Sequence, residues 1–289
     1  MKKILLCVSL SFIFLLFPLK LLCEEDANDA VYSSVLSEYY NKLDNEGIVA
    51  ANEYLQMQYA LHPKCASLSF CMGVIKCKWD ESYFIYNATE EACTYFENAY
   101  SIDSVSPDSI WGQGLVAYRN KDYNKAISFM TDFLLHISIS SEEGSLSINP
   151  STGIISCLDQ YSTAAFIILD CCAHGDSSDD SVPLSILMTR THLILDPSYF
   201  NPKTLRRGMQ VLYYSVQYAK QAKDPALVYQ YAKDYICIYN IIEREWRLNG
   251  STSTIDNQDE MVNYLNEMLA ISYYCLDILE SYYFEYTEF

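Results

Sequence analysis

Long stretches of mixed apolar and polar residues run through the chain without a glycine or proline. Only 9 Gly and 8 Pro occur in 289 residues. Because these two residue types interrupt regular structure, their scarcity favours helices over a turn-rich sandwich or barrel. We predict an all-α protein.

The helical pattern breaks at three places. From Ser138 to Ser156 the sequence loses its helical periodicity and gains Ser, Gly and Pro, which predicts a linker or long loop at 141–156. A second break, "DSSDDSVP" at 176–183, has no EF-hand spacing and is expected to be a solvated loop. A third, "GSTSTIDNQ", precedes the last helix. The helices predicted around these breaks cover 157–175, 203–223, 225–248 and 259–283.

A unit of 34 residues repeats in the first half. In the stretch that begins "NKDYNKAISF", Ala126 is followed by Met130 and Phe133, and 34 residues upstream of Ala126 Ala92 is followed by Phe96 and Ala99. A weaker copy, with Ala51, Leu55 and Pro63, starts 41 residues before Ala92, which is seven residues more than one period.

Two glycines locate the seven extra residues. Gly73 precedes Ala92 by 19 residues, whereas Gly114 precedes Ala126 by 12. The insertion therefore falls between the two halves of the second unit, around "WDESYFIYNAT", where a turn can absorb it.

This unit resembles the tetratricopeptide repeat, a 34-residue helical hairpin. The copy "IWGQGLVAYRNKDYNKAISFMTDFLL" carries the resemblance best, and positions that usually hold Gly, Tyr and Ala are here Lys121, Ala117 and Phe133. The resemblance covers about residues 31–140 and implies a right-handed superhelix of antiparallel helix pairs with a concave groove. We expect 24–140 to form such repeats and 157–289 to continue as diverged helical hairpins packed on the array.

In tetratricopeptide arrays the first helix of each unit lines the concave face. The resemblance thus implies a ligand-binding face made of aromatic residues, which supply burial, and two cations, which hold an acidic or polar end. Mapped onto this sequence, the implied face comprises Tyr40, Phe70, Lys78, Trp111, Tyr118 and Arg119.

The N-terminus predicts export. Lys2 and Lys3 precede an apolar run to Leu19 and then an acidic stretch, as in a signal peptide at 1–23, with an uncleaved membrane anchor as the alternative. Cys23 is a candidate lipidation site, although no small residue stands just before it. We expect an extracytoplasmic protein that is periplasmic, envelope-associated or secreted, and that reaches a membrane only through this segment.

Charge and cysteine content limit the classes of partner and the kinds of site that are expected. The formal charge of −18 repels phosphate backbones, which argues against nucleic acid and favours a partner that is neutral or basic overall. Of eleven cysteines, nine follow Cys23 without CxxC or zinc-site spacing, so neither a metal nor a cofactor is expected. Some of these cysteines could pair, and others could be small core hydrophobes. Cys171 and His174 could form a thiolate–imidazole pair, but no other catalytic motif accompanies them.

These observations favour an exported, non-enzymatic protein- or peptide-binding scaffold of tetratricopeptide type. The 26 tyrosines cluster late in the chain, as in Tyr213, Tyr214 and Tyr274, and could serve either recognition or inter-helix packing. The alternative is a periplasmic solute-binding or transport accessory protein whose tyrosines line a closed cavity.

Overall fold

The computed structural model describes residues 31–139, 146–147, 153–174, 181–195, 202–249 and 258–286. The predicted signal peptide and Cys23 lie outside them. The all-α prediction is confirmed. After a helix over residues 31–46, the elements in chain order are α2 (Ile48–Leu61), α3 (Ala66–Lys76), β1 (Lys78–Asp80), β2 (Ile85–Asn87), α4 (Glu90–Ile102), α5 (Pro107–Arg119), α6 (Tyr123–Leu135), β3 (Ser138–Ile139), β4 (Leu146–Ser147), α7 (Cys157–His174), α8 (Ser181–Ile194), α9 (Pro202–Gln221), α10 (Pro225–Asn249) and α11 (Gln258–Tyr286).

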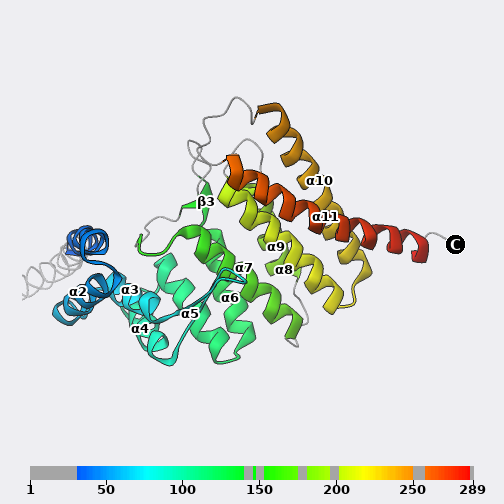
Figure 1. Cartoon of the computed structure of the whole chain (residues 1–289). Coiled ribbons are helices and arrows are strands. Elements are labelled where there is room, and N and C mark those ends of the chain that lie inside the picture. Colours follow the sequence, from blue (N-terminus) through cyan, green and yellow to red (C-terminus); the bar gives the residue numbers. More distant parts are fainter. Residues whose placement is uncertain are drawn as a thin grey trace, which may run out of the picture.

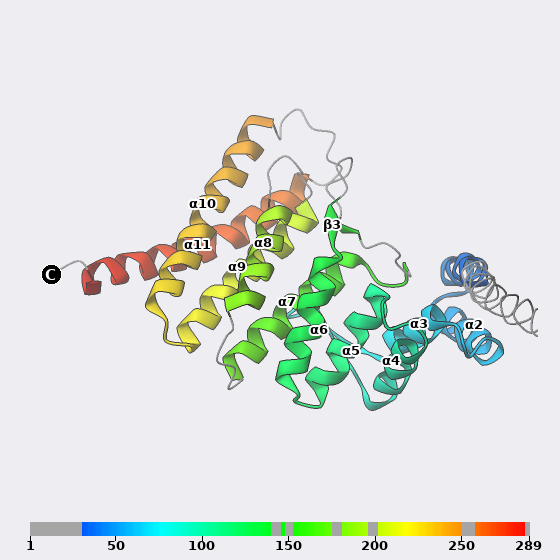
Figure 2. The same ribbon diagram turned by 180° about the vertical axis from the view of Figure 1, so that it is seen from behind.

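The helices form an elongated stack in which consecutive helices pack on each other. The blue N-terminal helices and the red end of α11 lie at opposite ends of the molecule (Figures 1 and 2). The closest neighbours are α3 with α4, α5 with α6, α6 with α7, α9 with α10, and α10 with α11, while α7 also contacts α9. Among the described residues, no helix is long and apolar enough to cross a membrane.

Small residues allow close approach within the predicted repeats. Ala92, Ala99 and Ala126 are fully buried. A Cβ atom added to Gly73 would lie 2.4 Å from the ring of Phe96, so glycine is required for that ring to pack there. The alanine and glycine positions of the 34-residue pattern are thus helix contacts.

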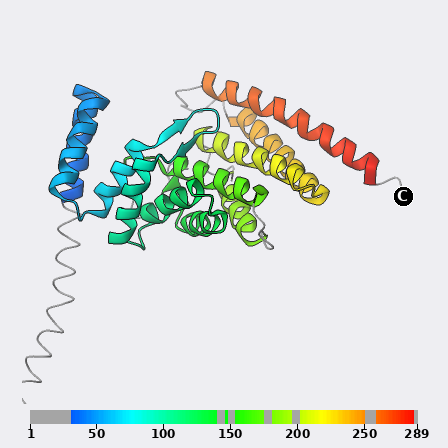
Figure 3. The same ribbon diagram turned by 90° about the horizontal axis from the view of Figure 1, so that it is seen from below.

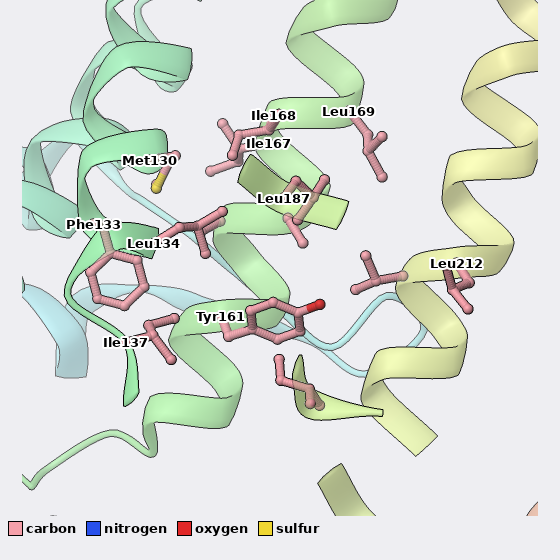
Figure 4. Packing of buried hydrophobic residues seen from close by; sticks show 14 of the residues in the cluster. Met130, Phe133, Leu134, Ile137, Tyr161, Ile167, Ile168, Leu169, Leu187 and Leu212 are labelled. Atoms are coloured by element: carbon pink, nitrogen blue, oxygen red, sulfur yellow. The ribbon is translucent and has the colours of Figure 1, made fainter. Parts of the chain in front are cut away.

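One core runs through both halves of the chain. Its buried side chains extend from Phe70 to Cys275, and a smaller cluster at the N-terminal end joins residues 31–46 to α2 and α3. Figure 4 shows the centre, where Met130 and Leu134 of α6, Tyr161 of α7 and Leu187 of α8 meet. The buried hydroxyl of Tyr161 forms a hydrogen bond with Thr191 Oγ1 at 2.8 Å.

Two of the predicted breaks contain regular secondary structure. β3 pairs antiparallel with β4 between α6 and α7, so two short paired strands lie where only a loop was expected. Because the core continues across this point, 141–156 does not separate independently packed halves. Residues 181–183 belong to α8, with Pro183 in its first turn, where a missing N–H is harmless.

The seven-residue insertion forms a β-hairpin between α3 and α4. Lys78 pairs with Asn87 and Asp80 with Ile85, and residues 81–84 form the turn. The cyan hairpin reaches away from its own helix pair and lies beside α9 (Figure 3). An insertion in the N-terminal half thereby contacts the C-terminal half.

Candidate binding surface

Two residues of the predicted groove are core residues. Phe70 and Trp111 are 1% and 0% exposed, and their ring centroids lie 6.0 Å apart in an edge-on arrangement. Trp111 Nε1 donates to the carbonyl of Gln160 at 3.0 Å. The prediction that these two face a ligand is wrong, because α7 and the ring of Phe96 close over them.

The other four predicted residues do not form one surface with them. Tyr118 donates to Asp170 Oδ2 at 2.8 Å, and burial, aided by this carboxylate, raises the pKa of its hydroxyl. Arg119 donates to the carbonyl of Ala88 at 2.9 Å, and Tyr40 donates to that of Gly153. Lys78 is exposed but lies in β1 instead of on a helix, because α3 ends at Lys76.

The structure does not support a thiolate–imidazole pair at Cys171 and His174. Cys171 is fully buried, and burial, with a smaller effect of Asp170, raises the pKa of its thiol to about 12. The thiol is therefore neutral near pH 7. Nδ1 of His174 lies 2.9 Å from the backbone oxygen of Asp170. Within the part of the chain that the structure describes, no three His, Cys, Asp or Glu side chains could hold a metal ion.

A continuous set of partly exposed rings, here called the aromatic row, runs from the β-hairpin to the C-terminal helix. It comprises Tyr83 of the hairpin turn, Phe166 of α7, Tyr214 and Tyr213 of α9, and Tyr274 of α11. Neighbouring ring centroids lie 5.5 Å (Tyr83–Phe166), 6.1 Å (Tyr83–Tyr214), 6.0 Å (Tyr213–Tyr214) and 6.2 Å (Tyr213–Tyr274) apart. Four elements that are distant in sequence thus build one aromatic surface.

Polar side chains of α9 accompany the aromatic row. Arg206, Gln210, Tyr213, Gln217 and Lys220 recur at alternate spacings of four and three residues, which places them on one helical face. Gln210 Nε2 donates to the Tyr214 hydroxyl at 2.7 Å. Gln217 Nε2 and Lys220 Nζ lie 3.3 and 2.6 Å from the Tyr274 hydroxyl. The row therefore presents flat rings edged by amide and hydroxyl groups.

An arginine holds the β-hairpin against α9. The guanidinium of Arg207 lies 3.5 Å from the ring centroid of Phe84 and 3.1 Å from Asp159 Oδ1. Burial lowers the pKa of Arg207, an effect that Asp159 partly offsets. Phe84 sits in the left-handed backbone region, with φ of 55°. This contact turns the hairpin tip, and with it Tyr83, towards α7 and α9.

Arg206 makes contacts of the same kind with the C-terminal helix α11. Its guanidinium lies 4.6 Å from the ring centroid of Tyr264, and its Nη2 lies 3.0 Å from Glu267 Oε2. Both arginines beside the row are therefore paired with a carboxylate and stacked on a ring.

The sequence carried only part of the signal for this surface. The clustering of tyrosines in the C-terminal half pointed to Tyr213, Tyr214 and Tyr274. Nothing in the sequence pattern joined them to Tyr83, which lies 131 positions before Tyr214 and reaches it only through the fold.

Comparison with protein-family models and curated proteins identifies no relative of this chain. No protein-family model matches the chain, and no curated protein matches it.

Proposed function

We propose that this chain is an exported, non-enzymatic scaffold of tetratricopeptide type that binds a protein or peptide through the aromatic row. The aromatic row is the observation that carries the proposal. Its tyrosines offer large, rigid, amphipathic contact area, and binding immobilises few rotatable bonds in them. Tyr83 is 46% exposed, and the other rings of the row are half-buried.

An open surface favours a polypeptide over an enclosed solute. A small ligand is usually surrounded by its site, whereas peptides lie on extended surfaces of helical arrays. The rings of the row come from a turn and three helices and share one partly exposed surface, which supports a ligand that lies across them. The acidic chain, with a charge of −18, supports a partner that is neutral or basic overall.

Site-specific crosslinking tests this proposal. A photoreactive benzoyl-phenylalanine replaces Tyr83 in the row or, as a control, Tyr229, which is 37% exposed on α10. We expect a discrete polypeptide adduct from the native compartment at position 83 and none at position 229. The captured partner should then bind the purified protein with saturable affinity. Adducts of equal yield at both positions, or no adduct at position 83, would contradict the proposal.

Export is the second part of the proposal, and intact-mass measurement of native protein tests it. A diacyl or triacyl adduct on Cys23 supports an anchored form, and an unmodified Glu24 start supports a released one. Recovery of the unprocessed chain from the cytosol would overturn both.

A further inference from the structure

We infer that the aromatic row binds a proline-rich segment in the polyproline II conformation. This inference rests on the proposed function and specifies the partner. It follows from three properties of the row: its succession of partly exposed rings, the spacing of its amide donors and the pairing of its two arginines with carboxylates.

The first property is the succession of rings. Proline-rich segments dock on surfaces lined with aromatic side chains, because the flat rings pack against the pyrrolidine rings of a helix that is already ordered before binding. In the row, neighbouring centroids are 5.5 to 6.3 Å apart from Tyr83 to Tyr274. The ring pairs are tilted or edge-on, with interplanar angles of 42° for Tyr213–Tyr214 and 74° for Tyr213–Tyr274.

The second property is the spacing of hydrogen-bond donors. A polyproline II helix has no internal hydrogen bonds, so its carbonyl oxygens need donors from the partner. Gln210 and Gln217 lie seven residues apart on α9, or about 10.5 Å at the rise of an α-helix. One polyproline II turn of three residues advances about 9.3 Å. The side-chain amide of each of these glutamines has two N–H bonds, one of which is directed to a tyrosine hydroxyl of the row.

The third property is charge. Arg206 is paired with Glu267 and Arg207 with Asp159, and Lys220 donates to the Tyr274 hydroxyl. A ligand on the row therefore meets two arginines whose charges are balanced by carboxylates, which matches an uncharged segment better than an acidic one. The Tyr274 hydroxyl does not balance the charge of Lys220 in this way. Flanking basic residues on the partner would meet a protein with a charge of −18.

Calorimetric titration with a defined probe tests the inference. The probe is acetylated and amidated decaproline, and the matched probe is an uncharged Gly–Ser decapeptide of equal length. We expect decaproline to bind the purified protein and the Gly–Ser peptide to bind at least tenfold more weakly. Cellohexaose serves as a third probe, because sugars also stack on aromatic rings.

Variants locate the binding. Tyr83→Ala and Tyr274→Ala each remove one ring and are expected to weaken decaproline binding tenfold or more. Gln217→Leu removes the amide donors at similar size and should weaken it roughly twofold to tenfold. Tyr229→Ala is the control and should leave the affinity unchanged. Circular dichroism checks that each variant keeps its helical content, and Tyr83, in an exposed turn, can be replaced without disturbing the core.

The outcomes separate this inference from the proposed function. Equal binding of decaproline and the Gly–Ser peptide, or binding that Tyr83→Ala and Tyr274→Ala leave unchanged, overturns the inference. Tyrosine-dependent binding of cellohexaose alone overturns it in favour of a carbohydrate ligand. If decaproline does not bind although Tyr83 still crosslinks to a polypeptide, only the polyproline inference fails. If both experiments are negative, the proposed function fails as well.

Discussion

The α5–α6 and α9–α10 hairpins reverse direction through the same turn, although only the first carries the 34-residue pattern. In the first, Lys121 has φ of 59° and the amide of Asp122 donates to the carbonyl of Ala117 at 2.9 Å. In the second, Lys223 has φ of 55° and the amide of Asp224 donates to that of Ala219 at 3.1 Å. The shared "KD" dipeptide therefore forms the same left-handed turn in both halves.

The two hairpins differ in length and in how their helices pack. α5 and α6 have 13 residues each, whereas α9 and α10 have 20 and 25. Gly114 of α5 contacts Met130 within its own hairpin, while Gly208 of α9 contacts Leu195, which follows α8. The comparison shows that a local turn can persist where the 34-residue spacing is lost. The turn depends on a few neighbouring residues, whereas the spacing depends on the lengths of whole helices.

The largest expected effect tests whether the two halves share one core. Trp111→Ala and Tyr235→Ala each empty a fully buried aromatic site, in α5 and α10 respectively. Truncation of a buried large aromatic side chain costs about 3–5 kcal/mol, and each variant also removes the side-chain hydrogen bond to the carbonyl of Gln160 or Met268. Urea denaturation followed by circular dichroism should show one shifted transition for each variant. A biphasic curve in which only half of the helix melts early would show that the halves unfold separately.

The next largest effect compares the two glycine contacts. A Cβ atom at Gly208 would lie 2.7 and 2.8 Å from Cδ2 and Cγ of Leu195, whereas at Gly114 it would lie 2.6 Å from Cε of Met130. The end of a methionine side chain moves more easily than the branch point of a leucine. We expect Gly208→Ala to cost about 1–3 kcal/mol and Gly114→Ala less. Thermal melting of both variants checks this, and an equal loss at the two sites would contradict it.

A smaller effect concerns the aspartate that caps the second helix of each hairpin. Asp224 Oδ1 accepts from the amides of Ala226 and Leu227, both at 3.0 Å, whereas Asp122 Oδ1 accepts from that of Lys125 at 3.4 Å. Loss of such a cap costs about 1 kcal/mol, so we expect that loss for Asp224→Ala and a smaller one for Asp122→Ala. Chemical denaturation measures both, and the reverse order would contradict the geometry.

The Asp122 cap also has a defined pH dependence. The pKa of Asp122 lies below its usual value, chiefly because its side chain bonds to that of Lys125. A carboxyl whose pKa is lower in the folded state stabilises the fold above its unfolded pKa, and this contribution disappears as the pH falls through the folded pKa. The difference in stability between wild type and Asp122→Ala should therefore shrink on acidification below about pH 4. A difference that grows instead would contradict this assignment.

The smallest effect tests whether the two turns are equivalent. Lysine in the left-handed region is strained, and glycine adopts it freely. Lys121→Gly and Lys223→Gly should each raise stability by about 0.5–1 kcal/mol, by similar amounts. Melting temperatures of the two single variants and the double variant check both equality and additivity. Stabilisation at Lys121 alone would show that only the repeat-like turn carries this strain.

The sequence determined the local structure of this protein. Scarce glycine and proline specified helices, and the positions of α9, α10 and α11 agree with the predicted segments within a few residues. The offset between Gly73 and Gly114 located the insertion that forms β1 and β2. These features depend on neighbouring residues and on period, which a single sequence displays.

Only the tertiary structure decided which aromatic residues are buried and which are exposed. The sequence pattern implied Trp111 as a recognition residue and did not single out Tyr83, but Trp111 is buried beneath α7, where it donates to Gln160, 49 residues away. Tyr83 remains exposed because Arg207, from a helix more than a hundred residues later, holds the neighbouring Phe84 and so fixes the hairpin tip. Such contacts join residues that no local period relates, so the surface on which the proposed function depends appears only once the chain is folded.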